Sequence, residues 1–176
     1  MPRERDHAVH EICLNDGPAD LALSALVRSD DQPAIRGGFM QSGGFDRLAT
    51  LLECPYATGR VQTKLFLLFK HVFAWYPSVK AAAVQRGLLP RLVSQVGSGD
   101  INHRESLLRA LLEFATTSGT AADQSAAKEL RHKSLGLKER LQRRVKEIKA
   151  IANREDKEQA EDELTLCNAL VKACKF

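Results

Sequence analysis

Hydrophobic residues recur every three or four positions over most of the sequence, which is the spacing of amphipathic helices. The densest such segment runs from Gly59 to Trp75, where apolar side chains occupy almost every face of the predicted helix. A helix of that kind is expected to lie between neighbouring helices rather than on the surface. Pro77 follows the segment and ends the helix, because the residue before a proline disfavours the helical conformation.

A second long helix is predicted from Asn102 to Thr116. Asn102 is a favourable N-cap, and Glu105 three residues later completes a capping-box pattern. A shorter apolar segment, residues 19–28, predicts a helix near the start of the chain. The residues expected on the buried side of the second long helix are Leu107, Leu108, Leu111, Leu112 and Phe114.

The C-terminal part of the sequence has a different pattern. Residues 138–152 are highly charged and carry one apolar stripe, formed by Leu141, Val145, Ile148 and Ile151. Residues 153–162 are polar and predict a turn. A last amphipathic helix is predicted over residues 163–174, with Leu164, Cys167, Leu170, Val171 and Cys174 facing inward.

A glycine followed by an apolar residue and an Arg-Leu pair occurs twice, at Gly44 and Gly87, and a weaker copy surrounds Gly136. The first two glycines are 43 residues apart and the next two 49 apart. The shorter spacing matches the period of armadillo and HEAT repeats, and the excess in the longer one is expected to be a loop over residues 116–127. A glycine suits the position because it adopts positive φ freely between two helices.

These patterns predict an all-α fold, namely an armadillo-like right-handed helical solenoid. We expect residues 1–18 to be poorly structured or a marginal helix, residues 19–134 to form the repeats, and residues 135–176 to form C-terminal capping helices. An all-β fold is disfavoured, because aromatic residues make up only 6% and glycine and proline number 11 and 6 in 176 residues.

The sequence contains no apolar run long enough to span a bilayer and no apolar segment after its charged start. We therefore expect a cytoplasmic protein without a membrane association. Its four cysteines form no C-x-x-C pair, so a disulfide framework is not expected and the cysteines are interpreted as small core residues.

Several segments together resemble the armadillo-type nucleotide-exchange factors of the 70-kDa heat-shock chaperones, the heat-shock-protein-70-binding protein 1 family with its fungal Fes-type relatives. The segments are residues 21–28, Gly44-Phe45, residues 64–73 closed by Pro77, residues 135–137 and residues 161–174 with both cysteines. The resemblance implies binding to the ATPase domain of such a chaperone and release of ADP. The sequence departs from the family by lacking its leader and first helices.

The surface expected to bind this partner is the side of the long helices that the core pattern leaves unclaimed. The mixture of apolar and charged side chains on that side suits a protein partner, and Arg109 is the strongest single candidate because arginine is enriched at interface hot spots. We expect a monomer that uses no cofactor and no small-molecule substrate. The candidate partner-binding residues are Arg28, Lys64, Leu67, Lys70, His71, Glu105, Ser106, Arg109 and Glu113.

Other functions receive less support from the sequence. No nucleophile, phosphate-binding or dinucleotide motif appears, so an enzyme is not expected. His7 and His10 have metal-ligand spacing, but only Cys13 offers a third ligand, so no metal site is expected. A basic run over residues 131–146 keeps nucleic-acid binding as an alternative, although acidic residues interrupt it and no aromatic residues interleave it. An armadillo or HEAT adaptor with another partner is the stronger alternative.

Overall fold

The computed structural model describes residues 33–54, 59–117, 119–151 and 153–176. Within these ranges the chain forms α-helices, one short 3-10 helix and no strand, so the predicted all-α fold class is confirmed. The elements are α3 (Pro33–Gln41), α4 (Gly44–Glu53), α5 (Gly59–Trp75), α6 (Ser78–Gln85), α7 (Leu88–Ser94), α8 (Ile101–Ala115), α9 (Ala121–Leu130), η1 (Lys133–Leu135), α10 (Leu137–Lys149), α11 (Arg154–Gln159) and α12 (Glu161–Cys174).

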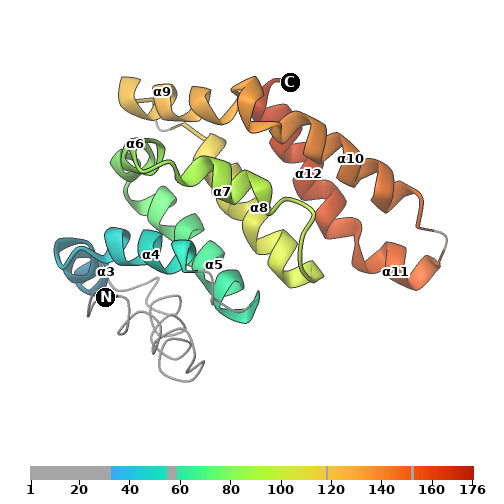
Figure 1. Ribbon diagram of the computed structural model, residues 1–176, viewed down its shortest axis with the longest axis horizontal. Helices are drawn as coiled ribbons and strands as arrows, with labels where there is room; N and C mark the ends of the chain where they lie inside the picture. The colour runs from blue at the N-terminus through green and yellow to red at the C-terminus, as the bar shows by residue number, and fades with distance from the viewer. Residues whose placement is uncertain (1–32, 55–58, 118, 152) are drawn as a thin grey trace, which may run out of the picture.

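The helices follow one another across the molecule in chain order, from α3 and α4 at one end to α10, α11 and α12 at the other (Figure 1). The most extensive helix contact joins α5 to α8, and the next joins α8 to α12. These three long helices therefore form one row. The shorter helices make a second set of contacts, in which α6 packs on α9, α7 on η1 and α10 on α12.

Three glycines with positive φ each precede a helix outside the row of α5, α8 and α12. Gly43, Gly87 and Gly136 have φ of 76°, 67° and 65° and lead into α4, α7 and α10. Residues that carry a side chain rarely adopt a positive φ, which explains why glycine recurs at these positions. The turn was assigned to Gly44, which is wrong by one residue; the first spacing is thus 44, because 87 minus 43 is 44.

Each of these turns is followed, five residues later, by a fully buried leucine. Leu48, Leu92 and Leu141 are 1%, 0% and 0% exposed. An arginine precedes each leucine, and that of α10, Arg140, donates to the Ser94 carbonyl at the end of α7 at 3.3 Å. Backbone turn, arginine and buried leucine therefore recur as one unit at three places in the chain.

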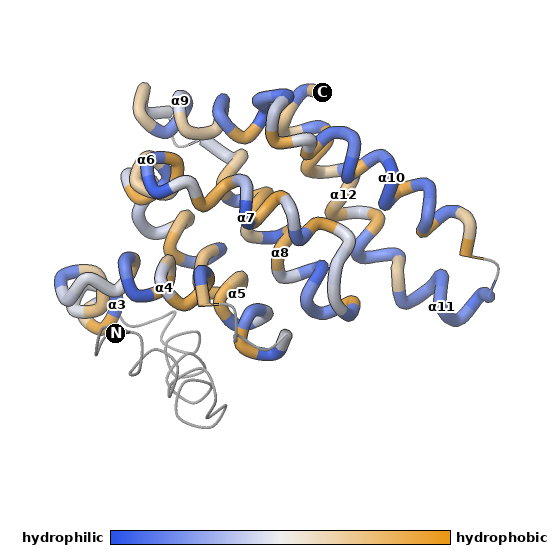
Figure 2. The backbone as a smooth tube through the Cα atoms, viewed as in Figure 1, coloured by the Kyte–Doolittle hydropathy of each residue, from blue (hydrophilic) through white to orange (hydrophobic). Residues whose placement is uncertain are grey.

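The centre of the core is aromatic. Phe73 of α5 stacks on Phe69 at 5.7 Å between ring centroids and meets Phe114 of α8 edge to ring at 5.0 Å. Phe45 of α4 reaches Phe69 at 6.3 Å, so one line of rings joins three helices. Figure 2 shows that hydrophobic residues are concentrated in α5, α7 and α8, whereas α10 and α11 are mainly hydrophilic.

Several predicted boundaries need correction. Asp100, not Asn102, caps α8 by accepting a hydrogen bond from the His103 backbone N–H at 2.8 Å. The expected loop over residues 116–127 contains the first part of α9, which Thr120 caps by accepting from the Asp123 N–H. The polar residues 153–162 form the short helix α11 rather than only a turn, because Asn153 caps it.

The start of α9 is held by a buried ion pair. Nζ of Lys80 lies 3.0 Å from Oδ1 of Asp123, and the two side chains are 2% and 0% exposed. Lys80 also donates to the carbonyl of Thr116 just after α8. These contacts join α6, α8 and α9. The start of α9 is thus held by a charged pair rather than by apolar residues, so it leaves no hydrophobic pattern from which the sequence could predict it.

The inward faces of α10 and α12 follow the prediction closely. Leu141 and Ile148 are buried in α10, while Val145 is half-buried. In α12, Cys167, Leu170 and Cys174 are buried as predicted, whereas Leu166 replaces Leu164 in the core. Burial raises the pKa of the Cys167 thiol to about 12 and that of Cys174 to about 11, so both remain protonated core residues near neutral pH.

Cys54 is buried, as interpreted, but the expectation that no disulfide forms is wrong for it, because it is disulfide-bonded. No helix within the described ranges is long and apolar enough to cross a membrane.

Candidate partner-binding surface

The outward side of α5 carries the predicted residues of that helix. Lys64, Leu67, Lys70 and His71 are all half-buried, while the side chains between them form the core. They lie one helical turn apart on one face, as three- and four-residue steps require. At the end of this stripe the His71 ring lies 5.2 Å from the Trp75 ring, and the guanidinium of Arg36 from α3 lies 4.7 Å over Trp75.

The outward side of α8 carries three of its four predicted residues. Arg109 is 45% exposed and pairs with Glu105 one turn earlier at 3.7 Å, while Glu113 is half-buried. Ser106 is only 6% exposed, so its prediction as a surface residue is wrong. Both α5 and α12 pack against α8, so its buried face includes small polar residues as well as the apolar ones.

The contacts between α5 and α8 show how the two stripes lie. Phe66 of α5 meets His103, and Phe73 of α5 meets Phe114, so residue numbers rise together along both helices. The helices are therefore parallel. At this offset Lys64 lies near the level of Glu105, and His71 near the level of Glu113. We treat the two stripes together as one candidate surface, the α5–α8 strip, defined by Lys64, Leu67, Lys70, His71, Glu105, Arg109 and Glu113.

The chemistry of the α5–α8 strip is that of a binding surface with mixed charge. Lysines lie on α5, whereas α8 presents an arginine between two carboxylates. Arg109 is exposed whereas the other strip residues are half-buried, and a salt bridge at this exposure is worth little by itself. It is therefore available to exchange its intrahelical partner for one on another protein. Arg28 lies outside the described residues.

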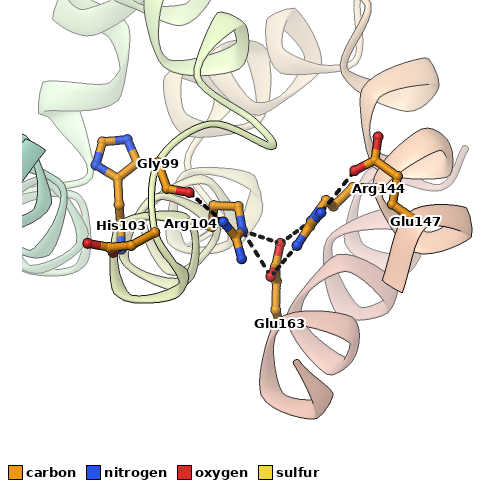
Figure 3. Close-up of polar contacts among 7 residues, drawn as sticks. Gly99, His103, Arg104, Arg144, Glu147 and Glu163 are labelled. Atoms are coloured by element: carbon orange, nitrogen blue, oxygen red, sulfur yellow. Dashed lines mark hydrogen bonds and ion pairs between the residues drawn. The ribbon is translucent and has the colours of Figure 1, made fainter. Parts of the chain in front are cut away.

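A buried polar cluster between α8, α10 and α12 was not predicted. Glu163 of α12 is 0% exposed and accepts from Nε of Arg104 at 3.0 Å and from Nε and Nη2 of Arg144 at 2.6 and 3.0 Å. Figure 3 shows the carboxylate between the two guanidinium groups. Arg144 also bonds Glu147 at 2.9 Å, and Arg104 donates to the Gly99 carbonyl.

The hydrogen bonds that Arg144 donates to Glu163 raise the pKa of Arg144 above its ordinary value, so this guanidinium stays charged. The cluster joins α8, α10 and α12 at one point and fixes the end of the three-helix row. The sequence held a signal for it, because Glu163 precedes Cys167, Leu170 and Cys174 by four, seven and eleven residues. Those steps place the carboxylate on the apolar face of the helix.

His103 of α8 lies in the contact between α5 and α8, as Glu163 lies in the contact between α8 and α12. It is 3% exposed, its Nδ1 lies 3.4 Å from the Thr63 hydroxyl, and its Nε2 is buried without a hydrogen-bond partner. Burial lowers the pKa of this imidazole, against a smaller opposing effect of a hydrogen bond to the Gly59 backbone. The ring is thus a neutral packing residue rather than an exposed acid or base.

Within the described ranges, no three histidine, cysteine or acidic side chains come together as a metal site. The His7, His10 and Cys13 triplet lies outside those ranges. A scan against protein-family models finds no matching family, and a search of curated proteins finds no match either.

Proposed function

We propose that the chain is an armadillo-like right-handed helical solenoid that works as a cytoplasmic cochaperone. It binds the ATPase domain of a 70-kDa heat-shock chaperone through the α5–α8 strip and promotes release of ADP. The single observation that carries the solenoid is the recurrence of a positive-φ glycine before α4, α7 and α10 and of a buried leucine within each of these helices. The partner rests on the sequence resemblance.

The geometry supports a binding function in two ways. The long helices lie in a row, so their outward sides make one continuous face of the kind that helical-repeat proteins use for partners. The face combines half-buried Leu67 with charges of both signs, which suits a protein surface with ion pairs around an apolar contact.

The mechanism follows from linkage between two ligands of the chaperone. A cochaperone that holds the open arrangement of the ATPase lobes more tightly than the closed one must weaken nucleotide binding by the same factor. The chain needs no catalytic group for this activity. It needs only a rigid surface, which the buried cluster at Glu163 and the aromatic line through Phe73 provide.

The test is release of a fluorescent ADP analogue from a cytosolic 70-kDa chaperone. The intact chain is expected to accelerate release, and Arg109→Ala and Lys64→Glu are each expected to weaken chaperone binding about tenfold. Arg91→Ala is the matched control, because Arg91 is an exposed arginine on α7, outside the strip. It should leave both readouts unchanged.

The other outcomes separate the alternatives. A stable complex without faster release would make the chain a binding module and overturn the exchange activity. Absence of any complex would overturn the chaperone as partner and leave an armadillo-type adaptor for another protein. Equal losses in Arg91→Ala would overturn the assignment of the α5–α8 strip.

A further inference from the structure

Two adjoining hollows lie away from the α5–α8 strip, between α6, α7, α9, η1 and α10. The first, which we call the basic pocket, has a volume of about 410 Å³. It is lined by Arg131, His132, Lys133, Leu137, Lys138, Glu139, Gln142 and Phe176. Three permanent cations thus face one carboxylate over an apolar floor.

The second hollow, the apolar pocket, has a volume of about 300 Å³. It is lined by Val84, Gly87, Leu89, Pro90, Glu129, His132, Ser134 and Leu135. His132 lines both pockets, so they adjoin at this residue. We call the two together the groove, with a basic half and an apolar half.

His132 is held in a defined orientation between the two halves. Its Nδ1 accepts a hydrogen bond from the Ser134 backbone N–H at 3.4 Å and lies 2.8 Å from the Ser134 hydroxyl. Ser134 thus holds the imidazole of His132 in place where the two pockets adjoin.

Arg131 is half-buried and lines the basic pocket. Guanidinium groups bind carboxylates with paired hydrogen bonds, so Arg131 suits an acidic ligand in this pocket.

We propose that this groove binds an extended acidic segment of a partner protein. One apolar side chain of the segment enters the apolar pocket, and neighbouring carboxylates pair with Arg131 and Lys138. The apolar half and the two carboxylates in the lining, Glu129 and Glu139, favour a peptide over a nucleic-acid backbone, which needs a denser array of cations. The groove uses helices other than α5 and α8, so it is separate from the proposed chaperone-binding strip.

The test is fluorescence anisotropy of a short labelled peptide of glutamates around a single leucine, titrated with the full chain. We expect saturable binding that weakens as salt rises from about 50 mM to about 200 mM. Arg131→Ala and Lys138→Glu should each weaken binding about tenfold. Lys138 is exposed in the first turn of α10, where a glutamate is favourable for the helix, so this variant keeps the fold.

Matched controls distinguish a groove from general attraction. Lys128→Glu changes an exposed cation on α9 that lines neither pocket, and it should alter affinity less than twofold. A peptide with serine in place of leucine should bind about fivefold more weakly because it leaves the apolar pocket empty. The chaperone plays no part in this assay, so its result is independent of the ADP-release test.

Three results would overturn the proposal. The first is absence of peptide binding, and the second is an equal loss in Lys128→Glu, which would indicate unspecific charge attraction. The third is that an RNA oligonucleotide binds more tightly than the peptide and that Arg131→Ala and Lys138→Glu abolish this RNA binding. That result would assign the groove to nucleic acid instead.

Discussion

The two junctions of the long-helix row are built from different chemistry. Between α5 and α8 the contacts are aromatic, with Phe66 against His103 at 4.9 Å and Phe73 against Phe114 at 5.0 Å. Between α8 and α12 the central contact is ionic, with Glu163 held by Arg104 and Arg144. The same helix, α8, therefore packs through rings on one side and through charges on the other.

The difference has consequences for how each junction tolerates change. Apolar packing depends on volume and little on direction, so neighbouring side chains partly refill a lost contact. A buried carboxylate between two guanidinium groups depends on direction, and its removal leaves two largely buried cations without the acceptor that they share. We therefore expect the α8–α12 junction to be the more fragile under a single substitution.

The largest effect is expected for Glu163→Ala. It leaves the guanidinium groups of Arg104 and Arg144, with side chains 16% and 15% exposed, without their common acceptor. We expect a loss of about 3 kcal/mol in the free energy of unfolding, at the lower end for broken buried pairs because the arginines retain some contact with water. Urea unfolding followed by circular dichroism measures it, and Thr165→Ala, exposed on the same helix, should cost less than about 0.5 kcal/mol.

Replacement of the whole cluster separates charge from volume. A triple variant with Glu163→Leu, Arg104→Met and Arg144→Met should recover most of the stability that Glu163→Ala loses, because buried ion triads replaced by apolar residues are often neutral. A triple variant less stable than Glu163→Ala would contradict the view that unpaired charge is the cause.

The α5–α8 junction should respond less to a comparable change. Phe73→Leu removes the edge-to-ring contact with Phe114 but keeps an apolar side chain of similar size. We expect a loss of about 1 to 1.5 kcal/mol, from the aromatic contact and a small residual cavity. The same urea titration measures it. A loss as large as that of Glu163→Ala would refute the proposed difference between the junctions.

The helices themselves could be predicted from the sequence because hydrophobic periodicity reports which face is buried. It placed α5 at its observed bounds and located the turns before α4, α7 and α10 to within one residue. The start of α9 was missed because its buried polar residue, Asp123, is held by Lys80, which lies in another helix. A distant charge partner leaves no local pattern.

The candidate surface could be predicted only in part for a related reason. The side chains of α5 lie as expected, but Ser106 of α8 is buried although it is polar. Residues on a helix are separated by about 100° each, so a helix covered on two sides buries small polar residues at the edge of its apolar face. Glu163 is the extreme case, since its charge suggests solvent while its spacing from Cys167 and Leu170 indicates the core.

The smallest effect, and the one that best distinguishes the junctions, is their response to acid. Burial lowers the pKa of His103 below 6.5, with smaller opposing effects of the Gly59 backbone and the Asp100 charge and a weaker lowering by Arg104. The unfolded chain therefore binds a proton at a higher pH than the folded chain does. Stability due to this residue is fully present above pH 6.5 and falls as pH decreases from there toward the lower folded pKa.

The measurement is the midpoint of urea unfolding between about pH 7 and about pH 5, where most carboxylates stay ionised. The parent chain should lose stability in this interval, and His103→Gln should flatten the profile because glutamine does not titrate. Glu163→Ala should keep the slope of the parent, since it leaves His103 and its packing against Phe66 in place. A parent profile that His103→Gln leaves unchanged would assign the acid response to other histidines, and the α5–α8 junction would then be apolar in function as well as in appearance.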